Sequence, residues 1–353
     1  MKCIAISSGG TAGHINPALS IAHKLAGKGW QIHYLGNKDS LEQKLLAKTE
    51  FSFYELNVQK IYRKLTLAHL KFPFKLLMSI ASSRRVMKEI KPDVFLGCGG
   101  FVCGPPGFAA HLLHIPIILQ EQNSYPGLTT RLLSKYSDMI FLGNKQAKSH
   151  LTKARTEYSG NPIKAYPTYK KIITNNSINK RTIFLVGGSQ GSLALNNMMV
   201  EVAQPLLEQG INIIWQTGMR HYKKLHQLMG NQKGLTLFDY STEIDKHYHN
   251  ADIIIARAGA LTLAELETLH KPSILIPLPT SAENHQLFNA KEQAEKGIAE
   301  VIEQKDLTPE TLIKYINNML SRITEYEDNF GETLHANAAE HIAAYIDLNY
   351  GRE

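Results

Sequence analysis

Cysteine is scarce in this 353-residue chain, and its few cysteines form no pattern. Cys3, Cys98 and Cys103 are too sparse for a disulfide framework and lack the spacing of metal ligands. We therefore expect a protein of a reducing compartment without a structural zinc ion. Only four residues separate Met1-Lys2 from the polar residues that begin at Ser7, so no secretory signal peptide is expected.

Long apolar runs that could span a membrane are also lacking. The stretch Val94–Leu119 has no Lys, Arg, Asp or Glu, but it contains five glycines, three prolines and two histidines. This composition does not suit a continuous spanning helix. The stretch instead predicts a buried strand, a glycine loop, a helix and a second buried strand.

Two common phosphate-binding patterns are missing. The sequence has no Asp-X-Asp pair that could hold a metal-bound diphosphate, and it has no Gly-X4-Gly-Lys-Ser/Thr loop. We therefore expect neither a metal requirement nor a cofactor. A bound diphosphate would have to be stabilised by backbone amides and by Arg or Lys side chains.

Charge is distributed unevenly along the chain. Residues 1–162 contain 21 Lys and Arg against 9 Asp and Glu, a net +12, whereas residues 163–353 contain 18 against 22, a net −4; the sum is the overall +8. A basic half suits an anionic membrane or an anionic substrate. Nucleic acid is not expected as a partner, because no nucleic-acid-binding motif accompanies the charge.

Short β-branched runs alternate with helical patterns throughout, which is typical of parallel sheets covered by helices on both faces. The length suggests two domains, at about 100–200 residues each. We predict an α/β fold with two tandem Rossmann-like doubly wound domains, 1–162 and 163–336, joined by a polar linker within 161–180. A last helix, 337–349, is expected to pack back onto the first domain. The predicted strands are Cys3–Ile6, Gln31–Leu35, Asp93–Leu96, Ile115–Leu119, Met139–Leu142, Glu157–Ser159, Arg181–Val186, Ile211–Gln216, Leu235–Phe238, Asp252–Ala256, Ser273–Pro277 and Glu300–Ile302.

Each predicted domain opens with a strand, a glycine turn and a helix. The turns are Gly9-Gly10-Thr11-Ala12-Gly13 and Gly187-Gly188-Ser189-Gln190-Gly191, and a third glycine cluster, Gly97–Gly107, follows another strand. Such turns let a ligand approach the backbone, and the helix offers free amides to an anion. Neither turn has a complete dinucleotide fingerprint, because Ser8 and Val186 replace its first glycine, so a dehydrogenase is disfavoured.

The second domain contains a further candidate anion site. Arg257, Gly259 and Glu265 follow the predicted strand Asp252–Ala256 and enter a new helix. Arg257 would face an anion beside the helix start, and Glu265 would accept hydrogen bonds from ribose hydroxyls. The alternative for Glu265 is a surface carboxylate stabilised by the helix dipole.

Two residues of the first domain are candidates for a general base. His14 follows the first glycine turn, and Glu121 ends a buried strand. A histidine titrates near neutrality and suits this role. His14 could also be only a polar residue at a helix start. Glu121 is a rival base, an orienting partner of His14, or a structural hydrogen-bonding group.

The stretch Leu65–Ile80 mixes Leu, Phe and Met with Lys71 and Lys75, and three cations follow at Arg84, Arg85 and Lys88. An apolar face rimmed by cations suits an anionic bilayer surface. The alternative is a core-facing helix with solvated lysines. Together with the basic half of the chain, this stretch favours the membrane.

In combination, the motifs closely resemble those of the MurG family of peripheral membrane glycosyltransferases, nearly from end to end. The resemblance implies the GT-B arrangement, in which two Rossmann-like domains face a cleft. It also implies the donor UDP-GlcNAc, the acceptor lipid I (undecaprenyl-diphosphate-linked MurNAc-pentapeptide) and the product lipid II, formed with inversion. The location implied is the cytoplasmic face of the cell (inner) membrane.

The resemblance also implies roles for individual residues. Thr11, Ala12, Gly13 and Asn123 would approach the donor from the first domain, and Ser189 would contact it from the second. Backbone around Ser241 would touch the uracil, and Gln286 would bind the GlcNAc hydroxyls. The diphosphate and ribose would lie on Ala260, Leu261, Thr262, Leu263, Ala264 and Glu265, with Glu265 on the ribose. Three positions depart from the family pattern: Ala12 replaces glycine, Gln120 replaces histidine, and Lys164 replaces an arginine that would contact phosphate.

Two other functions fit the same architecture. One is a UDP-GlcNAc 2-epimerase, which would act on the donor without an acceptor. The other is a non-catalytic nucleotide-sugar-binding module at the membrane, which would bind UDP-GlcNAc without turnover.

Overall fold

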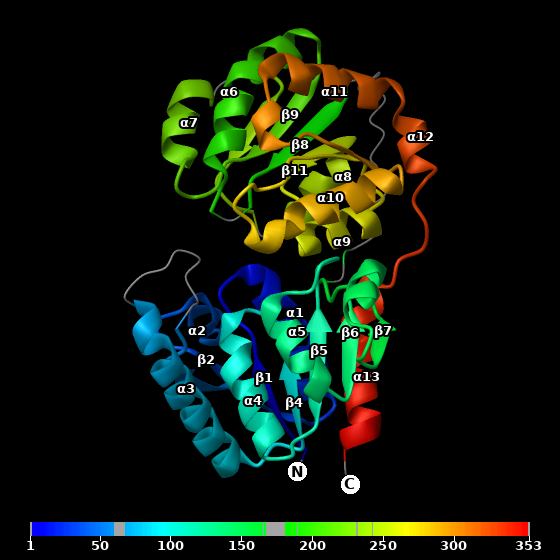
Figure 1. Ribbon diagram of the computed structural model, residues 1–353. Coiled ribbons are helices and arrows are strands. Elements are labelled where there is room, and N and C mark those ends of the chain that lie inside the picture. Colours follow the sequence, from blue (N-terminus) through cyan, green and yellow to red (C-terminus); the bar gives the residue numbers. More distant parts are fainter. Residues whose placement is uncertain are drawn as a thin grey trace. The chain divides into compact units, whose positions relative to one another are not determined.

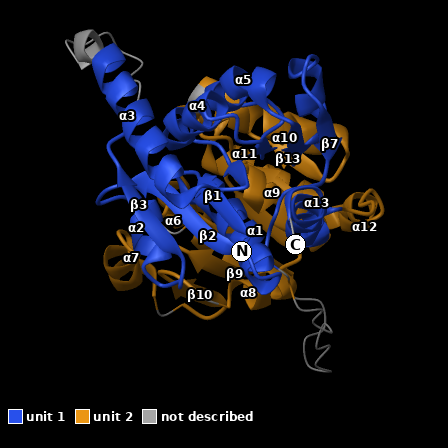
Figure 2. Ribbon diagram, turned by 90° about the horizontal axis from the view of Figure 1, so that it is seen from below, with its two compact units in different colours: residues 1–164, 334–353 blue, residues 165–333 orange. Residues whose placement is uncertain are grey.

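The computed structural model describes residues 2–59, 68–164, 166, 181–188, 190–230, 232–241 and 243–351. The chain divides into two compact units (Figure 2). Unit 1 comprises residues 1–164 and 334–353, and unit 2 comprises residues 165–333. Both lie within a few residues of the boundaries expected from the sequence.

Unit 1 is built on a seven-stranded parallel sheet in the order β3-β2-β1-β4-β5-β6-β7 (Figure 1). The order reverses between β1 and β4, and open α/β sheets bind ligands beside the carboxyl ends of strands at such a point. The strands are β1 (Cys3–Ser7), β2 (Gln31–Asn37), β3 (Ser52–Leu56), β4 (Val94–Gly97), β5 (Ile117–Glu121), β6 (Met139–Leu142) and β7 (Thr156–Tyr158).

Helices cover both faces of this sheet because its buried strands send apolar side chains to alternate sides. Ile4 and Ile6 pack with α1 (Ala12–Gly27) and α13 (Ala338–Tyr350) on one face. Ala5 and Phe95 pack with residues of α3 (Ala68–Ile90) and α4 (Gly104–Leu112) on the other. The remaining helices of unit 1 are α2 (Leu41–Leu46) and α5 (Leu128–Leu133).

The last helix belongs to unit 1, although it follows unit 2 in the sequence. Ile342 and Ile346 of α13 are fully buried in the core shared with α1. Asp347 accepts hydrogen bonds from Lys2 Nζ and Trp30 Nε1, both at 2.8 Å. These hydrogen bonds lower the pKa of the Asp347 carboxyl. The two ends of the chain are thereby tied together in one domain.

Unit 2 repeats the design with a six-stranded parallel sheet in the order β10-β9-β8-β11-β12-β13. Its strands are β8 (Thr182–Val186), β9 (Asn212–Gln216), β10 (Leu235–Phe238), β11 (Ile253–Ala256), β12 (Ser273–Leu275) and β13 (Ala299–Val301). Its helices are α6 (Leu193–Glu208), α7 (Tyr222–Met229), α8 (Ile244–Asn250), α9 (Ala260–Thr268), α10 (His285–Glu295), α11 (Pro309–Ser321) and α12 (Ile323–Glu327). The order reverses between β8 and β11, as it does between β1 and β4.

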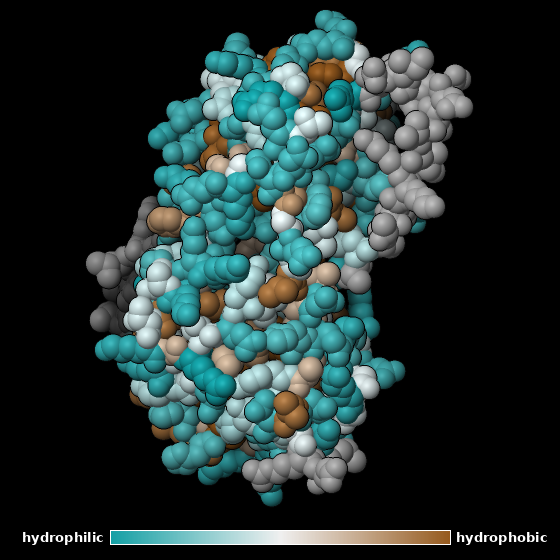
Figure 3. All heavy atoms as spheres, turned by 90° about the vertical axis from the view of Figure 1, so that its right-hand side faces the viewer, coloured by the Kyte–Doolittle hydropathy of each residue, from teal (hydrophilic) through white to brown (hydrophobic). Residues whose placement is uncertain are grey.

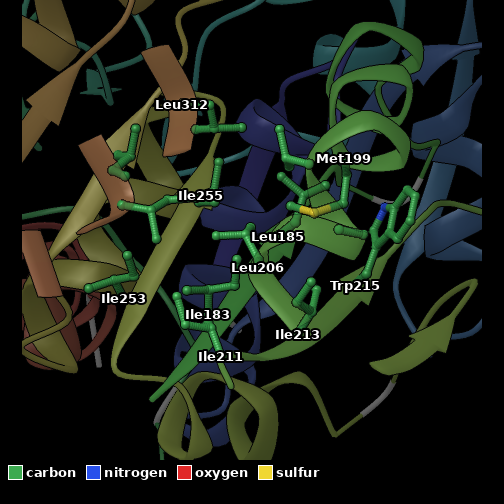
Figure 4. Close-up of a cluster of buried hydrophobic side chains, with 14 of the residues drawn as sticks. Ile183, Leu185, Met199, Leu206, Ile211, Ile213, Trp215, Ile253, Ile255 and Leu312 are labelled. Atoms are coloured by element: carbon green, nitrogen blue, oxygen red, sulfur yellow. The ribbon is translucent and has the colours of Figure 1, made fainter. Parts of the chain in front are cut away.

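One face of the second sheet is drawn in Figure 4, where Ile183, Leu185, Ile213 and Ile255 meet side chains of α6 and α11. Residues of α7 and α12 complete this cluster. The opposite face packs on α8, α9 and α10. Both sheets are therefore doubly wound, and the predicted α/β class is confirmed.

One strand, β3, is absent from the strands predicted from the sequence. It forms the edge of the first sheet beside β2, and most of its residues are only partly buried. An edge strand needs no continuous apolar run, so the signal used for the other strands is weak there. The uncharged stretch Val94–Leu119 does contain the expected strand, glycine loop, helix and strand.

Short 3-10 helices connect several of these elements: η1 (Phe101–Cys103), η2 (Ser134–Tyr136), η3 (Lys145–His150), η4 (Ala282–Asn284), η5 (Gln304–Asp306) and η6 (His335–Asn337). In the part of the chain that the structure describes, no helix is both long and apolar enough to span a bilayer. The molecular face in Figure 3 is mainly hydrophilic, with apolar residues scattered among polar ones.

Candidate active site

The glycine turns lie at the two points where strand order reverses. In unit 1, the first turn follows β1 and the cluster Gly97–Gly107 follows β4. In unit 2, the second turn follows β8 and Arg257-Ala258-Gly259 follows β11. Each unit thus brings two candidate motifs to adjacent strand ends, which is where doubly wound folds bind ligands.

The glycines of unit 1 allow two loops to pack backbone against backbone. Gly10 has φ +86° and Gly100 has φ +79°, a region that favours glycine. A Cβ atom on Gly100 would lie 2.1 Å from the carbonyl oxygen of Gly9. The turn after β1 and the turn after β4 therefore form one compact structure.

The first turn leads directly into α1, with Thr11 as its N-cap residue. The Thr11 carbonyl accepts hydrogen bonds from the amides of His14, at 3.1 Å, and Ile15, at 3.2 Å. The amides of Ala12 and Gly13 precede the helical ladder and have no intrahelical acceptor. They are the backbone donors that this turn offers to an anion.

His14 lies in the first turn of α1, and its ring is held by Gln122. The Nδ1 atom lies 2.7 Å from the side-chain oxygen of Gln122. Gln122 directly follows β5, is 2% exposed, and so has little freedom to move. The residue that orients the His14 ring in this structure is therefore Gln122 and not Glu121.

Glu121 is occupied by the turn that follows β5. It is 2% exposed, and one carboxylate oxygen accepts from the Asn123 amide at 3.0 Å and from Asn123 Nδ2 at 3.1 Å. The other oxygen accepts from the Gly127 amide at 3.1 Å. These contacts join Glu121 to the turn after β5 and fix the position of Asn123.

A polar network behind Gln122 connects β5 to the C-terminal segment. Asn161 donates to the Gln122 carbonyl at 3.0 Å and accepts from Gln120 Nε2 at 3.2 Å. The Asn161 amide donates to His335 Nδ1 at 2.8 Å. These bonds tie Asn161 and His335 to unit 1, close to its two boundaries with unit 2. Lys164 is exposed.

The second glycine turn, in unit 2, packs against the end of β9. Gly188 and Gly191 have φ values of +78° and +75°. A Cβ atom on Gly191 would lie 2.1 Å from the Thr217 carbonyl oxygen. Ser192 is the N-cap residue of α6, and Ser189 lies outside the described residues.

Arg257 connects the start of α6, beside the second glycine turn, to the segments that follow β12 and β13. Its Nη1 donates to the carbonyls of Ile276, at 3.0 Å, and Pro277, at 3.3 Å. Its Nη2 donates to Ser192 Oγ at 2.9 Å and to Gln304 Oε1 at 2.7 Å. All four acceptors are uncharged, and burial lowers the pKa of Arg257 to about 10. The result is a partly buried positive charge whose hydrogen bonds go to neutral groups.

The N-terminus of α9 follows Arg257 and begins at Gly259, its N-cap residue. The Leu263 amide donates to the Gly259 carbonyl at 3.0 Å, so the helical ladder begins there. The side chains of Leu263 and Ala264 are 5% and 2% exposed and support the helix from the core. The amides of Ala260, Leu261 and Thr262 precede the ladder and remain the candidate anion donors.

Glu265 lies in the second turn of α9 and is held by tyrosines. Tyr248, which is 1% exposed, donates to Glu265 Oε2 at 3.3 Å. Tyr166 also hydrogen-bonds to the Glu265 carboxylate. Burial, followed by the nearby Glu265 charge, raises the pKa of both tyrosines, so both stay protonated and act as donors. The carboxylate is thus fixed in orientation.

The two remaining candidates of unit 2 are Gln286, in the first turn of α10, and Ser241, in the turn after β10. Gln286 Oε1 accepts from the Leu278 amide at 3.0 Å, so its side-chain nitrogen faces away from that bond. The two residues before α10, Glu283 and Asn284, have φ values of +50° and +58°, in the left-handed region that favours glycine. Ser241 Oγ accepts from the Glu243 amide at 3.1 Å and shapes the turn after β10.

Among the described residues, no group of three or more His, Cys, Asp or Glu is arranged to hold a metal ion.

Several residues of these sites were not anticipated. Gln122 directly follows Glu121 at the end of a strand, so the two side chains point to opposite faces, and this alternation could have separated their roles. No sequence motif pointed to Ser192, Gln304 or Tyr248, because their contacts join segments far apart in the chain. The same holds for His335.

Comparison with known proteins shows which class of protein the chain belongs to. Residues 4–142 match the N-terminal domain of glycosyltransferase family 28, and residues 182–344 match its C-terminal domain. Two proteins named UDP-N-acetylglucosamine–N-acetylmuramyl-(pentapeptide) pyrophosphoryl-undecaprenol N-acetylglucosamine transferase are similar over most of their length. The first, from Bacillus thuringiensis subsp. konkukian, is 33% identical over 90% of each chain. The second, from Shewanella amazonensis, is 35% identical over 88% of this chain and 87% of the relative.

The solved structures agree with this class. MurG from Acinetobacter baumannii has a TM-score of 0.78 at 29% identity, covering 99% of this chain and 100% of that one. The chain therefore belongs to the MurG family, within glycosyltransferase family 28, and has the GT-B fold. A UDP-GlcNAc 2-epimerase from Neisseria meningitidis, solved with UDP-GlcNAc bound, has a TM-score of 0.64 at 16% identity, covering 99% of this chain and 100% of that one. That likeness concerns the fold alone.

Proposed function

We propose that this protein transfers GlcNAc from UDP-GlcNAc to the C4 hydroxyl of the MurNAc unit in lipid I, producing lipid II and UDP. The observation that carries the proposal is a hydrogen-bonded imidazole at the strand-order reversal of unit 1, in a chain that belongs to the MurG family. The matching reversal in unit 2 supplies helix amides, a cation and a fixed carboxylate.

The reaction is a single displacement. The oxygen of the MurNAc C4 hydroxyl forms a bond to the anomeric carbon of GlcNAc while the bond from that carbon to the UDP oxygen breaks. The hydroxyl proton passes to His14 Nε2, and UDP leaves with the electron pair of the broken bond. One displacement inverts the anomeric configuration. Glu121 is the less suitable base, because both its oxygens already accept hydrogen bonds.

Unit 2 is the proposed donor site. Glu265 would accept from the ribose hydroxyls, since Tyr248 and Tyr166 hold its carboxylate in place. The amides of Ala260, Leu261 and Thr262 would bind the diphosphate, as helix N-termini bind phosphate elsewhere. The side-chain nitrogen of Gln286 would donate to a GlcNAc hydroxyl, because its oxygen is taken by the Leu278 amide.

Arg257 would assist through its charge rather than through a direct hydrogen bond. Its four hydrogen bonds go to uncharged acceptors, so the positive charge has no carboxylate among them to cancel it. A partly buried charge acts in a lower dielectric than water, which strengthens its attraction for a nearby diphosphate. It would stabilise the leaving UDP in this way. The proposed contacts with the donor from unit 1 are Thr11, Ala12, Gly13 and Asn123, together with Lys164, which would contact phosphate. From unit 2, Ser189 and Ser241 are the remaining proposed contacts.

Helix α3 is the proposed contact with an anionic membrane. Phe74, Leu77 and Met78 are 67%, 65% and 57% exposed, at a spacing that puts them on one stripe of the helix. Ser79 and Ser83, by contrast, are buried. This helix thus turns an apolar stripe outward, and such a stripe next to exposed cations suits insertion at a bilayer surface. We define Phe74, Leu77 and Met78 as the α3 apolar stripe.

The cations of α3 lie on the exposed side as well: Lys75, Arg84, Arg85 and Lys88. They would attract anionic lipid headgroups at about 1 kcal/mol each near the surface. Of the stretch Leu65–Ile80, residues 65–67 lie outside the described residues. The proposed location is therefore peripheral, on the cytoplasmic face of the cell membrane where a lipid-linked acceptor would be reached.

The experiment that tests the function measures UDP release from UDP-GlcNAc with and without a lipid I analogue. We expect release only with the acceptor, together with a product heavier by one GlcNAc. Epimerisation of UDP-GlcNAc by the protein alone would support the epimerase instead, and binding without turnover would support the non-catalytic module. We propose that no metal is needed, so the rate should survive EDTA; loss of activity that Mg²⁺ restores would contradict this.

A further inference from the structure

We propose that Gln122 is a positioning residue that fixes the neutral His14 ring as the tautomer with its proton on Nδ1. Nε2 is then the unprotonated nitrogen that accepts the proton of the acceptor hydroxyl. The inference deepens the proposed function and rests on it for the role of His14. Its observations are the 2.7 Å contact of His14 Nδ1 with Gln122 Oε1 and the orientation of the Gln122 amide.

The surroundings of Gln122 determine which end of its amide faces His14. Its nitrogen donates to the carbonyl oxygens of Cys98, at 3.0 Å, and Gln120, at 3.3 Å, and also to the side-chain oxygen of Gln120. Turning the amide over would place its oxygen against these three acceptors. The oxygen must therefore face His14.

An amide oxygen can only accept a hydrogen bond, so the facing Nδ1 atom must donate one. A neutral imidazole carries a single ring proton, and the contact with Gln122 assigns it to Nδ1. Nε2 is left with its lone pair, and it has no hydrogen-bond partner in the described part of the chain. The ring is thus prepared to act as a base at one defined atom.

The uncharged nature of Gln122 matters to this role. Among the described residues, neither a carboxylate nor a cation forms a hydrogen bond or ion pair with His14. A carboxylate partner would favour the protonated ring, whereas a neutral amide orients the ring without that bias. Gln122 would therefore orient the His14 ring without placing a charge beside it.

The packing around the pair leaves little room for other ring positions. Gly99 has φ +83°, and a Cβ atom there would lie 3.0 Å from His14 Nδ1. The Gln122 carbonyl accepts from Asn161 Nδ2 at 3.0 Å. Gln122 is thus held by hydrogen bonds of both its side chain and its backbone, and its contact with Nδ1 fixes the orientation of the His14 ring.

A double-mutant cycle separates positioning from general support of the fold. Gln122→Met keeps the approximate size of the side chain but removes the acceptor. We expect it to lower kcat about 10-fold or more, part of the about 10²–10⁴-fold that a general base contributes, with little change in the KM for UDP-GlcNAc. In a His14→Ala background the same substitution should have almost no effect on kcat, because its target is gone. Equal losses in both backgrounds would overturn the proposal.

The ring tautomer can be observed without activity. In ¹⁵N-labelled protein, the His14 signals, identified by their loss in His14→Ala, should show a protonated Nδ1 and an unprotonated Nε2 at neutral pH. Gln122→Met should shift the population toward the other tautomer, and Gln146→Met, at an exposed glutamine of unit 1, should not. A wild-type ring protonated on Nε2 would also overturn the proposal. Full activity of His14→Ala with the expected tautomer would instead count against the proposed base and leave the contact itself intact.

Discussion

The two strand-order reversals have the same backbone design but different side chains. In unit 1 the reversal between β1 and β4 holds His14 against the neutral, buried Gln122. In unit 2 the reversal between β8 and β11 holds Arg257 among neutral acceptors and Glu265 under two tyrosines. The first offers a titratable group that can gain a proton, and the second offers charges that are fixed.

This difference assigns separate tasks to two similar folds. In unit 1 an uncharged partner orients the group proposed to take up a proton, whereas in unit 2 the groups proposed to bind a diphosphate and a ribose keep their charge and orientation. The glycine turns supply the same helix amides in both units. The function is thus decided by the few side chains placed beside the turns.

The largest expected effect comes from removing the titratable group of unit 1. His14→Ala should lower kcat by about 10²–10⁴-fold, because no base then takes the hydroxyl proton. Binding of UDP, measured by calorimetry, should stay unchanged, since the proposed nucleotide contacts of unit 2 are intact. Near-full turnover of this variant would remove His14 from the role of base.

Removing the fixed carboxylate of unit 2 should give the opposite pattern. Glu265→Gln keeps the size of the side chain but loses its charge, and hydrogen bonds to charged groups contribute about 1.5–3 kcal/mol. UDP-GlcNAc should therefore bind roughly 10–100-fold more weakly, while kcat at saturating donor changes far less.

The matched control for this variant is Glu267→Gln on the same helix. Glu267 pairs with Lys296 at 3.0 Å and should affect stability but not the affinity for UDP-GlcNAc. Equal losses of affinity in the two variants would show that the Glu265 effect is only structural.

The basic half of the chain differs from the acidic half in its proposed membrane contact. Replacing both Phe74 and Leu77 by Ser should weaken binding to vesicles that contain anionic lipid by about 10-fold or more, because each buried apolar side chain contributes about 1.5–3 kcal/mol. Leu348→Ser, on α13, removes another exposed leucine, 86% exposed, and should leave vesicle binding unchanged. Flotation with vesicles measures the binding of the double variant and of Leu348→Ser. Binding as strong as wild type by the double variant would show that the α3 apolar stripe is not the membrane contact.

The smallest effect concerns stability in mild acid. Burial lowers the pKa of His247 in unit 2 below its usual 6.5, and it does the same to His33 in unit 1. Below about pH 6.5 the unfolded chain binds a proton at each of these positions more readily than the folded chain, so stability falls as the pH drops through this range. The rings of His247 and Phe238 are stacked, with their centroids 4.3 Å apart. His247→Phe should therefore keep this packing but remove the part of the stability loss at low pH that comes from protonation of His247.

Urea unfolding at pH 7.5 and pH 5.5 measures this difference. The free energy of unfolding should drop less for His247→Phe than for the wild type between the two pH values. An equal or larger drop in the free energy of unfolding of the variant would contradict a lowered pKa for His247.

The sequence predicted most of the fold because buried parallel strands and glycine turns leave strong local signals. The edge strand β3 was missed because a half-exposed strand needs no apolar run. At the site, the motifs located His14, Arg257 and Glu265, but they did not reveal what each contacts. Those contacts cross 108 residues for His14 and Gln122 and 65 for Arg257 and Ser192, and no local pattern records them.

The anomeric configuration of the product tests the central claim of a single base-assisted displacement most directly. UDP-GlcNAc carries its sugar in the α configuration, so direct attack by the MurNAc hydroxyl must give a β linkage. We expect the proton NMR spectrum of the product from a lipid I analogue to show the large H1–H2 coupling of a β-linked GlcNAc. An α-linked product would contradict a single displacement, and with it the role of His14 Nε2 as the atom that receives the proton.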